Sequence, residues 1–156
     1  KGQFYYYFKT KEELIFEVID KKAQKIFDDT VKNVAKEKTF YNKLLSLFSF
    51  YLGNCSAEDK LFDKLVKDTF YLYLNMKNQY IKQKNAEYYD FIHKIVDEIF
   101  TEMIEINYIK KDSKKFIPSL IATADGMYLQ AIILENYDIK KNLMDYIDIL
   151  DECLKI

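Results

Sequence analysis

The sequence predicts an all-helical protein, and three observations lead to this prediction. The 156 residues include only three Gly and one Pro, too few for the many tight turns of an all-β fold. Apolar residues recur at spacings of three and four over long stretches, as they do on one face of a helix. They make up 49% of the chain and charged residues 31%, the balance of a globular protein rather than a disordered one.

The ends of several helices can be predicted from single residues. Thr10 and Glu13 form a T-x-x-E capping box, which satisfies free backbone N–H groups at a helix start. Gly53 suits the residue after a helix end, Ser56 suits an N-cap, and Pro118 lies where the first turn of a helix tolerates it. The predicted helices are a long one that begins after Thr10 and reaches Val34, then 39–52, 57–76, 79–107 and 114–134, and a last helix that carries Leu143, Ile147, Leu150 and Leu154.

Charge and motifs exclude several classes of function. The net charge is −1 and every basic residue is Lys, so the chain lacks the broad basic surface of a complete nucleic-acid-binding domain. It has no Gly-rich phosphate loop, no catalytic triad pattern and no metal-ligand spacing, so we predict no enzyme activity, no metal and no cofactor. Cys55 and Cys153 are interpreted as reduced thiols of a cytoplasmic protein. No apolar run approaches the roughly 18 residues of a membrane span, so we expect no membrane partner.

The first 14 residues carry the most specific pattern in the chain. The stretch Lys1-Gly2-Gln3-Phe4-Tyr5-Tyr6-Tyr7-Phe8 is followed by Lys9-Thr10-Lys11-Glu12-Glu13-Leu14. This pattern resembles the end of the helix-turn-helix of the TetR (tetracycline-repressor-like) family of transcriptional regulators, where K-G-x-[FL]-Y-x-[HY]-F precedes K-x-K-E-x-L. The resemblance implies a remnant of the DNA-binding domain over residues 1–10 and a ligand-sensing and dimerisation domain over 11–156. It also implies that two helices preceding Lys1 are missing, so that the fragment alone would not bind DNA specifically.

The resemblance implies that this opening segment contacts operator DNA in the intact parent protein. In a recognition helix, polar side chains suit base edges, a glycine allows close approach, and hydroxyl and ammonium groups bind phosphates. An alternative is that Tyr5, Tyr6 and Tyr7 are core aromatics of a small helical domain. The residues expected to contact DNA are Lys1, Gly2, Gln3, Tyr5, Tyr6 and Lys11.

The middle helices are expected to enclose a pocket for a small, apolar or aromatic effector. Aromatic residues make up 17% of the chain, and ligand pockets are mostly apolar with a few polar anchors. The alternative is that these aromatics only fill core volume and that His93, the single histidine, lies on the surface. The residues expected to line the pocket are Phe48, Tyr51, Phe70, Tyr71, Tyr88 and His93.

The last two helices are expected to form a twofold homodimer, which would match a palindromic operator. Small residues in the first helix permit close packing, and apolar residues in the second recur at spacings of 4, 3 and 4 like a coiled-coil seam. The alternative is that both sets pack within one subunit. The residues expected at the interface are Ala122, Gly126, Leu129, Ile133, Leu143, Ile147, Leu150 and Leu154.

The sequence therefore predicts a ligand-responsive transcriptional regulator, most simply a repressor that its effector releases from DNA. The competing hypothesis is a helical protein-binding module, not linked to DNA, that docks a partner on an exposed aromatic surface. A regulator would have a buried cavity and a twofold interface, whereas a docking module would have a large exposed apolar patch.

Overall fold

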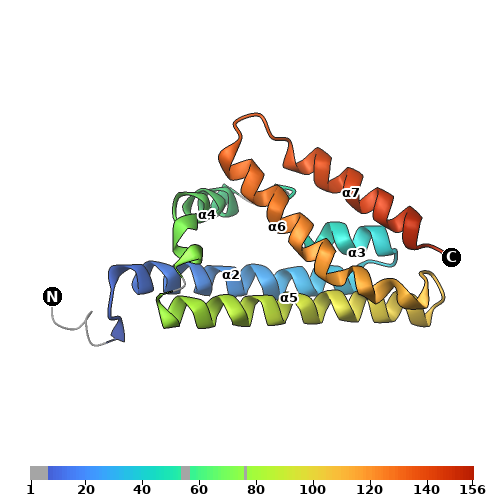
Figure 1. Cartoon of the computed structure of the whole chain (residues 1–156), viewed down its shortest axis with the longest axis horizontal. Helices are drawn as coiled ribbons and strands as arrows, with labels where there is room; N and C mark the ends of the chain where they lie inside the picture. Colours follow the sequence, from blue (N-terminus) through green and yellow to red (C-terminus); the bar gives the residue numbers. More distant parts are fainter. Residues whose placement is uncertain (1–6, 54–56, 76) are drawn as a thin grey trace. The chain divides into compact units, whose positions relative to one another are not determined.

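The computed structural model describes residues 7–53, 57–75 and 77–156, which are mostly helical (Figure 1). No β-strand occurs among these residues, and only an isolated antiparallel bridge joins Ile109 and Lys155. The prediction of an all-helical fold is confirmed. The elements are α2 (Lys11–Lys36), α3 (Phe40–Leu47), α4 (Ala57–Asp68), the 3-10 helix η1 (Phe70–Leu74), α5 (Gln79–Glu105), the 3-10 helix η2 (Lys111–Phe116), α6 (Ile117–Ile133) and α7 (Ile139–Leu154).

The packing divides the chain into two units. Unit 1 comprises Lys1–Asp29 and Ser56–Asp90, and unit 2 comprises Thr30–Cys55 and Phe91–Ile156. Because the divisions at 29/30 and 90/91 fall inside helices, α2 and α5 each contribute residues to both units. Each unit is described separately below.

Helix starts in the described residues follow simple capping chemistry. The Thr39 hydroxyl oxygen accepts a hydrogen bond from the backbone N–H of Asn42 at 3.1 Å and opens α3. The Asp138 carboxylate accepts one from the backbone N–H of Lys141 at 2.9 Å and opens α7. Pro118 lies in the first turn of α6, where its missing N–H group leaves no intrahelical bond unmade, as the sequence predicted.

Helix α3 is shorter than predicted. The prediction ran to Leu52, but the helix ends at Leu47 and turns follow it. The turn that begins at Phe48 allows both Phe48 and Leu52 to be buried, in addition to the buried helical face. Gly53 has a φ of +68°, the left-handed conformation expected of it, although it lies in this turn segment rather than directly after the helix.

The predicted helix over 57–76 is wrong, because α4 ends at Asp68 and a 3-10 helix follows. At the break, the Thr69 hydroxyl donates a hydrogen bond of 2.7 Å to the carbonyl oxygen of Leu65, one turn back. The change of helix type accompanies complete burial of Leu72, which packs with Phe16 and Ile81 in the core of unit 1. Tertiary packing thus overrides the helical periodicity of this stretch.

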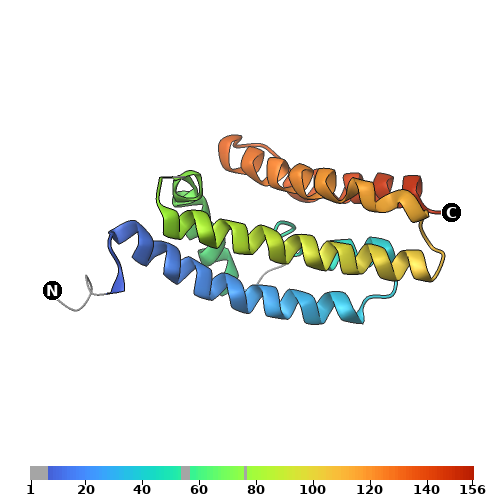
Figure 2. The ribbon, with the colours of Figure 1, turned by 60° about the horizontal axis from the view of Figure 1, so that its bottom comes forward.

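The core of unit 2 is formed mainly by α3, α5, α6 and α7, with α7 packed on both α3 and α6. Figure 2 shows α6 (orange) running in front of α7 (red). Phe40 and Phe100 meet edge to face with ring centroids 5.0 Å apart, and both are fully buried. The predicted helix over 79–107 is confirmed as α5, which ends two residues earlier, so Ile106 lies beyond it and is exposed. The other apolar residues of that predicted face in this unit are buried: Ile92, Ile95, Ile99 and Met103.

One charged side chain lies inside this core. Lys43 of α3 is 2% exposed, and its Nζ donates to the carbonyl oxygen of Val34 at 3.3 Å. The same Nζ lies 3.0 Å from a carboxylate oxygen of Glu102, whose side chain reaches solvent. Because a buried ammonium is costly unless it is paired, these two contacts explain how α3 accommodates it.

Candidate functional site

The residues predicted to contact DNA fall mostly outside the described part of the chain. Lys1, Gly2, Gln3, Tyr5 and Tyr6 are not among the described residues, so no structural statement concerns them. Lys11 is described, as the exposed first residue of α2. Its position at the start of a helix agrees with the expectation for that residue.

The predicted capping box is formed at the start of α2. The backbone N–H of Glu13 donates to the Thr10 hydroxyl oxygen at 3.1 Å. The Glu13 carboxylate accepts from the backbone N–H of Lys9 at 2.8 Å, so the reciprocal bond falls one residue before the cap. The Asn78 side-chain amide donates to the other oxygen of this carboxylate at 3.2 Å, and Glu13 is buried. The start of α2 is thereby attached to the residue that precedes α5.

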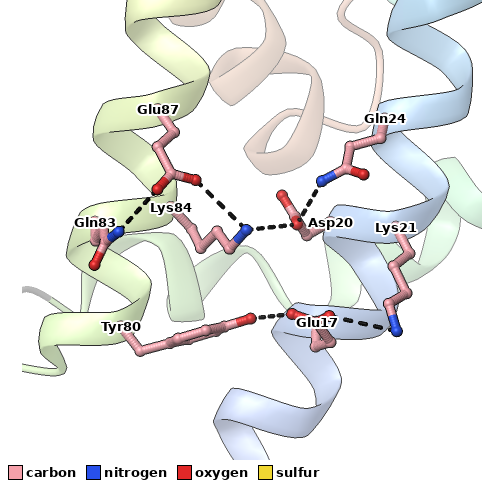
Figure 3. Close-up of polar contacts among 8 residues, drawn as sticks. All are labelled: Glu17, Asp20, Lys21, Gln24, Tyr80, Gln83, Lys84 and Glu87. Carbon is pink, nitrogen blue, oxygen red and sulfur yellow. Dashed lines mark hydrogen bonds and ion pairs between the residues drawn. The ribbon is translucent and has the colours of Figure 1, made fainter.

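Polar contacts continue along α2 and α5 in unit 1 (Figure 3). The Tyr80 hydroxyl donates to the carboxylate of Glu17. One turn further on, the Nζ of Lys84 lies 3.0 Å from a carboxylate oxygen of Asp20. We call these two pairs and the Glu13–Asn78 bond the polar ladder. Further contacts to Lys21, Gln24, Gln83 and Glu87 flank it.

The polar ladder changes the acid–base properties of its members. The hydrogen bond from Tyr80 is the main reason why the pKa of Glu17 lies below its usual 4.5, with Lys21 and Lys84 adding to the effect. Burial, followed by the hydrogen bond to Glu17 and the negative charge of that carboxylate, raises the pKa of the Tyr80 hydroxyl. The hydrogen bond with Asp20 raises the pKa of Lys84. At neutral pH Glu17 is therefore ionised, the Tyr80 hydroxyl is neutral and Lys84 is charged, as their contacts require.

Acid should weaken the ladder through Glu17. Because the folded-state pKa of Glu17 is lowered, its carboxylate stabilises the fold above the usual value of 4.5, and this stabilisation is lost as the pH falls through the lowered value. We expect Glu17→Gln to lower the free energy of unfolding by about 1 kcal/mol at pH 7, since the side chain is partly exposed and its hydrogen bond is screened. At pH 3 the difference between variant and wild type should shrink.

Urea unfolding followed by circular dichroism between pH 7 and pH 3 measures this effect. Glu98→Gln, which changes an exposed carboxylate on α5, serves as the matched control and should keep the pH dependence of the wild type. Equal pH profiles for Glu17→Gln and the wild type would contradict the assigned role of Glu17.

The residues predicted to line one ligand pocket belong to two separate units. In unit 1, Phe70 packs on Tyr73 with centroids 5.7 Å apart, and Tyr88 stacks on Phe27 at 5.4 Å. Tyr71 of the same 3-10 helix is 62% exposed, so it lies on the surface. The assignment of Phe70 and Tyr88 to a ligand pocket stays a prediction.

In unit 2, two of the predicted residues meet in an aromatic cluster. Phe48 is buried and stacks on Tyr51 with centroids 6.0 Å apart, and Tyr51 stacks on Tyr128 of α6 at 4.7 Å. Phe50 lies 6.3 Å from the Tyr128 ring. The Tyr51 hydroxyl donates to a carboxylate oxygen of Asp125 at 3.1 Å. We call Phe48, Phe50, Tyr51, Asp125 and Tyr128 the aromatic–carboxylate cluster.

The remaining predicted pocket residue lies elsewhere. His93 of α5 is exposed, in agreement with the alternative that it is a surface residue. Within the described part of the chain, no group of three His, Cys, Asp or Glu side chains is placed to hold a metal ion. Cys153 is exposed with a free thiol, whereas Cys55 lies outside the described residues.

The residues predicted at the dimer interface divide into two sets. Leu129 and Ile133 of α6 are 39% and 67% exposed, Ala122 is exposed, and Gly126 is half-buried. The residues of the seam on α7 are instead buried in the core of unit 2, against α3 and α6, so their placement at an interface with another copy is wrong. The buried seam residues are Leu143, Ile147, Leu150 and Leu154.

The expectation that no segment is long and apolar enough to span a membrane also requires correction. The stretch Lys111–Ile133, which contains α6, meets this criterion by length and composition, and 28% of its most apolar part is buried. Core helices of soluble proteins meet the same criterion, so it does not by itself assign α6 to a membrane. It does show that most of this apolar stretch is not buried among the described residues.

Sequence reasoning missed the polar ladder and the acidic member of the aromatic–carboxylate cluster. Glu17, Tyr80 and Lys84 stand among many similar residues, and no spacing rule singles out their pairing. Asp125 could have been found, because it is the single charged residue in the 17 residues of α6. A charge within so apolar a helix requires a polar partner and marks the position for attention.

Searches with protein-family models, among curated proteins and among solved structures find no match to this chain.

Proposed function

We propose that this chain is the ligand-sensing and dimerising part of a TetR-type transcriptional regulator, whose homodimer binds a palindromic operator and is released by a small effector. The observation that carries the proposal is the pattern over Lys1–Leu14, which leads through the capping box at Thr10 into the 26 residues of α2. In a regulator of this type, one long helix joins the DNA-reading segment to the sensor, and this helix must begin directly after the DNA-reading segment, as α2 begins after Thr10. The all-helical fold of the described residues is compatible with this arrangement.

Two features support a link between ligand and DNA. Helix α2 directly follows the DNA-reading pattern, and its first half is attached to α5 by the polar ladder. The aromatic–carboxylate cluster provides rings and a polar anchor, as ligand sites do. An effector that binds better to the conformation with separated DNA-reading segments would lower the affinity for the operator, and operator DNA would lower effector affinity equally.

The dimer is supported by the surface of α6. Its exposed and half-exposed apolar positions, including Leu129 and Ile133, would be covered by the same helix of a second copy. A twofold interface of this kind places two DNA-reading segments in the symmetry of a palindrome.

The proposal is tested by incubating the intact parent protein with random double-stranded DNA and sequencing the fragments that it binds. We expect enrichment of a twofold-symmetric sequence whose half-sites are about 10 base pairs apart, or a multiple of that spacing. The double variant Lys1→Ala with Gln3→Ala should lose the enrichment, because it removes the side chains assigned to base edges. Lys140→Ala, an exposed position on α7, is the control for loss of positive charge and should keep it.

One observation favours the alternative of a protein-docking module. Leu61 of α4 and Tyr71 and Leu74 of η1 are 71%, 62% and 70% exposed, so three large apolar side chains of unit 1 face solvent. A protein that enriched no DNA sequence in the selection would contradict the regulator and favour this alternative.

A further inference from the structure

A buried lysine connects α3 to the end of α2 in unit 2. The Lys43 side chain is 3% exposed, and its Nζ donates to the backbone carbonyl oxygen of Val34, in the last turn of α2, at 3.3 Å. The same carbonyl accepts a bond of 3.1 Å from the backbone N–H of Glu37, where the chain leaves the helix. Because the carboxyl end of a helix carries partial negative charge, an ammonium group is favourable at this position.

The counter-charge of this lysine lies on another helix and in a different environment. Among the described residues, the one carboxylate that pairs with Lys43 is that of Glu102 on α5, with an oxygen 3.0 Å from Nζ. The Glu102 side chain is 53% exposed. The positive charge of the pair is therefore inside the core, whereas solvent reaches the negative charge.

The two members of the pair depend on each other unequally. If Glu102 loses its charge, the ammonium of Lys43 stays in the core with a carbonyl acceptor alone, which is costly. It can become hydrated only if α3 moves, because its neighbours Phe40 and Leu44 hold this face of α3 in the core and are fully buried. If Lys43 loses its charge, Glu102 already reaches water and remains hydrated in place.

We propose that Lys43 and Glu102 form a conformational latch, which holds α3 against the end of α2 and is released from the solvent side. Neutralising the Glu102 carboxylate, or drawing it away from Lys43, would release the latch. Helix α3 and residues 37–39 would then open locally and let the ammonium become hydrated, while unit 1 stays folded. The inference does not rest on the regulator proposal, because it requires neither DNA nor an effector.

Hydrogen–deuterium exchange of the whole chain, measured by mass spectrometry on peptides that cover residues 37–48, tests the latch. Glu102→Gln keeps the shape of the side chain and removes its charge. We expect it to accelerate exchange in these peptides by at least about tenfold at pH 7. Exchange in peptides that cover residues 79–90 of unit 1 should stay within about twofold of the wild type. No acceleration, or equal acceleration in both regions, would overturn the proposal of a local latch.

Two further single variants serve as controls. Glu98→Gln removes an exposed carboxylate one turn earlier on α5 and should leave exchange within about twofold of the wild type. Lys43→Met provides an unbranched apolar side chain in place of the lysine. It should also stay within about twofold, because no buried charge then remains without a partner.

The double variant Lys43→Met with Glu102→Gln distinguishes a latch from an ordinary stabilising contact. If the unpaired ammonium is what opens α3, removing it should return exchange to about the rate of Lys43→Met alone. Equal acceleration by the two single variants, or acceleration in the double variant as large as in Glu102→Gln, would overturn the proposal. If Glu102→Gln alone does not fold, a double variant that folds supports the latch, and one that does not fold contradicts it.

Discussion

Replacing Leu143 by alanine should lower the free energy of unfolding by about 2–5 kcal/mol, because this fully buried side chain lies where α7 packs on α3 and α6. The loss combines the transfer of buried methyl groups from the core with the cavity that remains. Ile149→Ala on the same helix is the matched control. Ile149 is 60% exposed, so its truncation should change stability by less than about 0.5 kcal/mol.

Urea unfolding at two protein concentrations tenfold apart separates a core role for Leu143 from an interface role. If Leu143 belongs to the core of its own unit, the difference between variant and wild type is the same at both concentrations and persists in the monomer. If the difference in unfolding free energy between variant and wild type disappears when the protein is diluted to monomers, Leu143 lies at the interface between copies, and its placement in the core is contradicted.

The second large effect is expected for Ile133→Glu, which should raise the dissociation constant of the proposed homodimer by at least about a hundredfold. Ile133 is 67% exposed in its own unit, and a glutamate there remains hydrated in the monomer. In a dimer formed through α6, the two carboxylates would be buried without a partner and would approach each other. The fold of the monomer should therefore be unaffected while association is lost.

Sedimentation velocity over a range of concentrations measures this change. Ile106→Glu makes the same substitution at a residue that is 60% exposed and lies just beyond α5 rather than on α6. It should leave the dissociation constant within about twofold of the wild type. A wild-type protein that stays monomeric at high concentration, or equal weakening by the two variants, would contradict the dimer through α6.

The positions of the long helices could be predicted from the sequence because the signals that specify them, capping residues and apolar spacing, lie within each helix or next to it. The start of α2 is specified by the Thr10–Glu13 box, and the start of α6 tolerates Pro118 for a reason that concerns only its own first turn. Helix α5 was predicted to within two residues at its end, because apolar residues recur at spacings of three and four from Tyr88 to Ile106.

Two helix predictions failed where burial competed with periodicity. The segment 57–76 contains no Gly or Pro that would predict a break in the helix, yet the chain changes from α-helix to 3-10 helix at Thr69. Beyond this change, Leu72 packs with Phe16 and Ile81. These partners are 56 and 9 residues away in sequence, so no local pattern can indicate them. The same reasoning applies to Phe48 and Leu52, which become buried through turns beyond the end of α3.

The candidate site depends on the tertiary structure even more strongly. The abundance of aromatic residues suggested a ligand pocket, but composition cannot indicate that Phe48 and Tyr51 meet Tyr128 whereas Phe70 and Tyr88 belong to another unit. Asp125 was visible as an isolated charge in an apolar helix. Its partner, Tyr51, lies 74 residues away, and only the fold brings the two together.

By itself, the sequence determined the all-helical class, most helix boundaries and the presence of an apolar face on α7, because periodicity and capping act over three or four residues. It could not determine what each apolar face packs against, since an identical pattern arises from a core and from an interface. The tertiary structure decided this question by burying Leu143 and Ile147 inside unit 2 while leaving Leu129 and Ile133 of α6 exposed. The physical reason is that burial depends on which surfaces meet, and helices distant in sequence supply those surfaces.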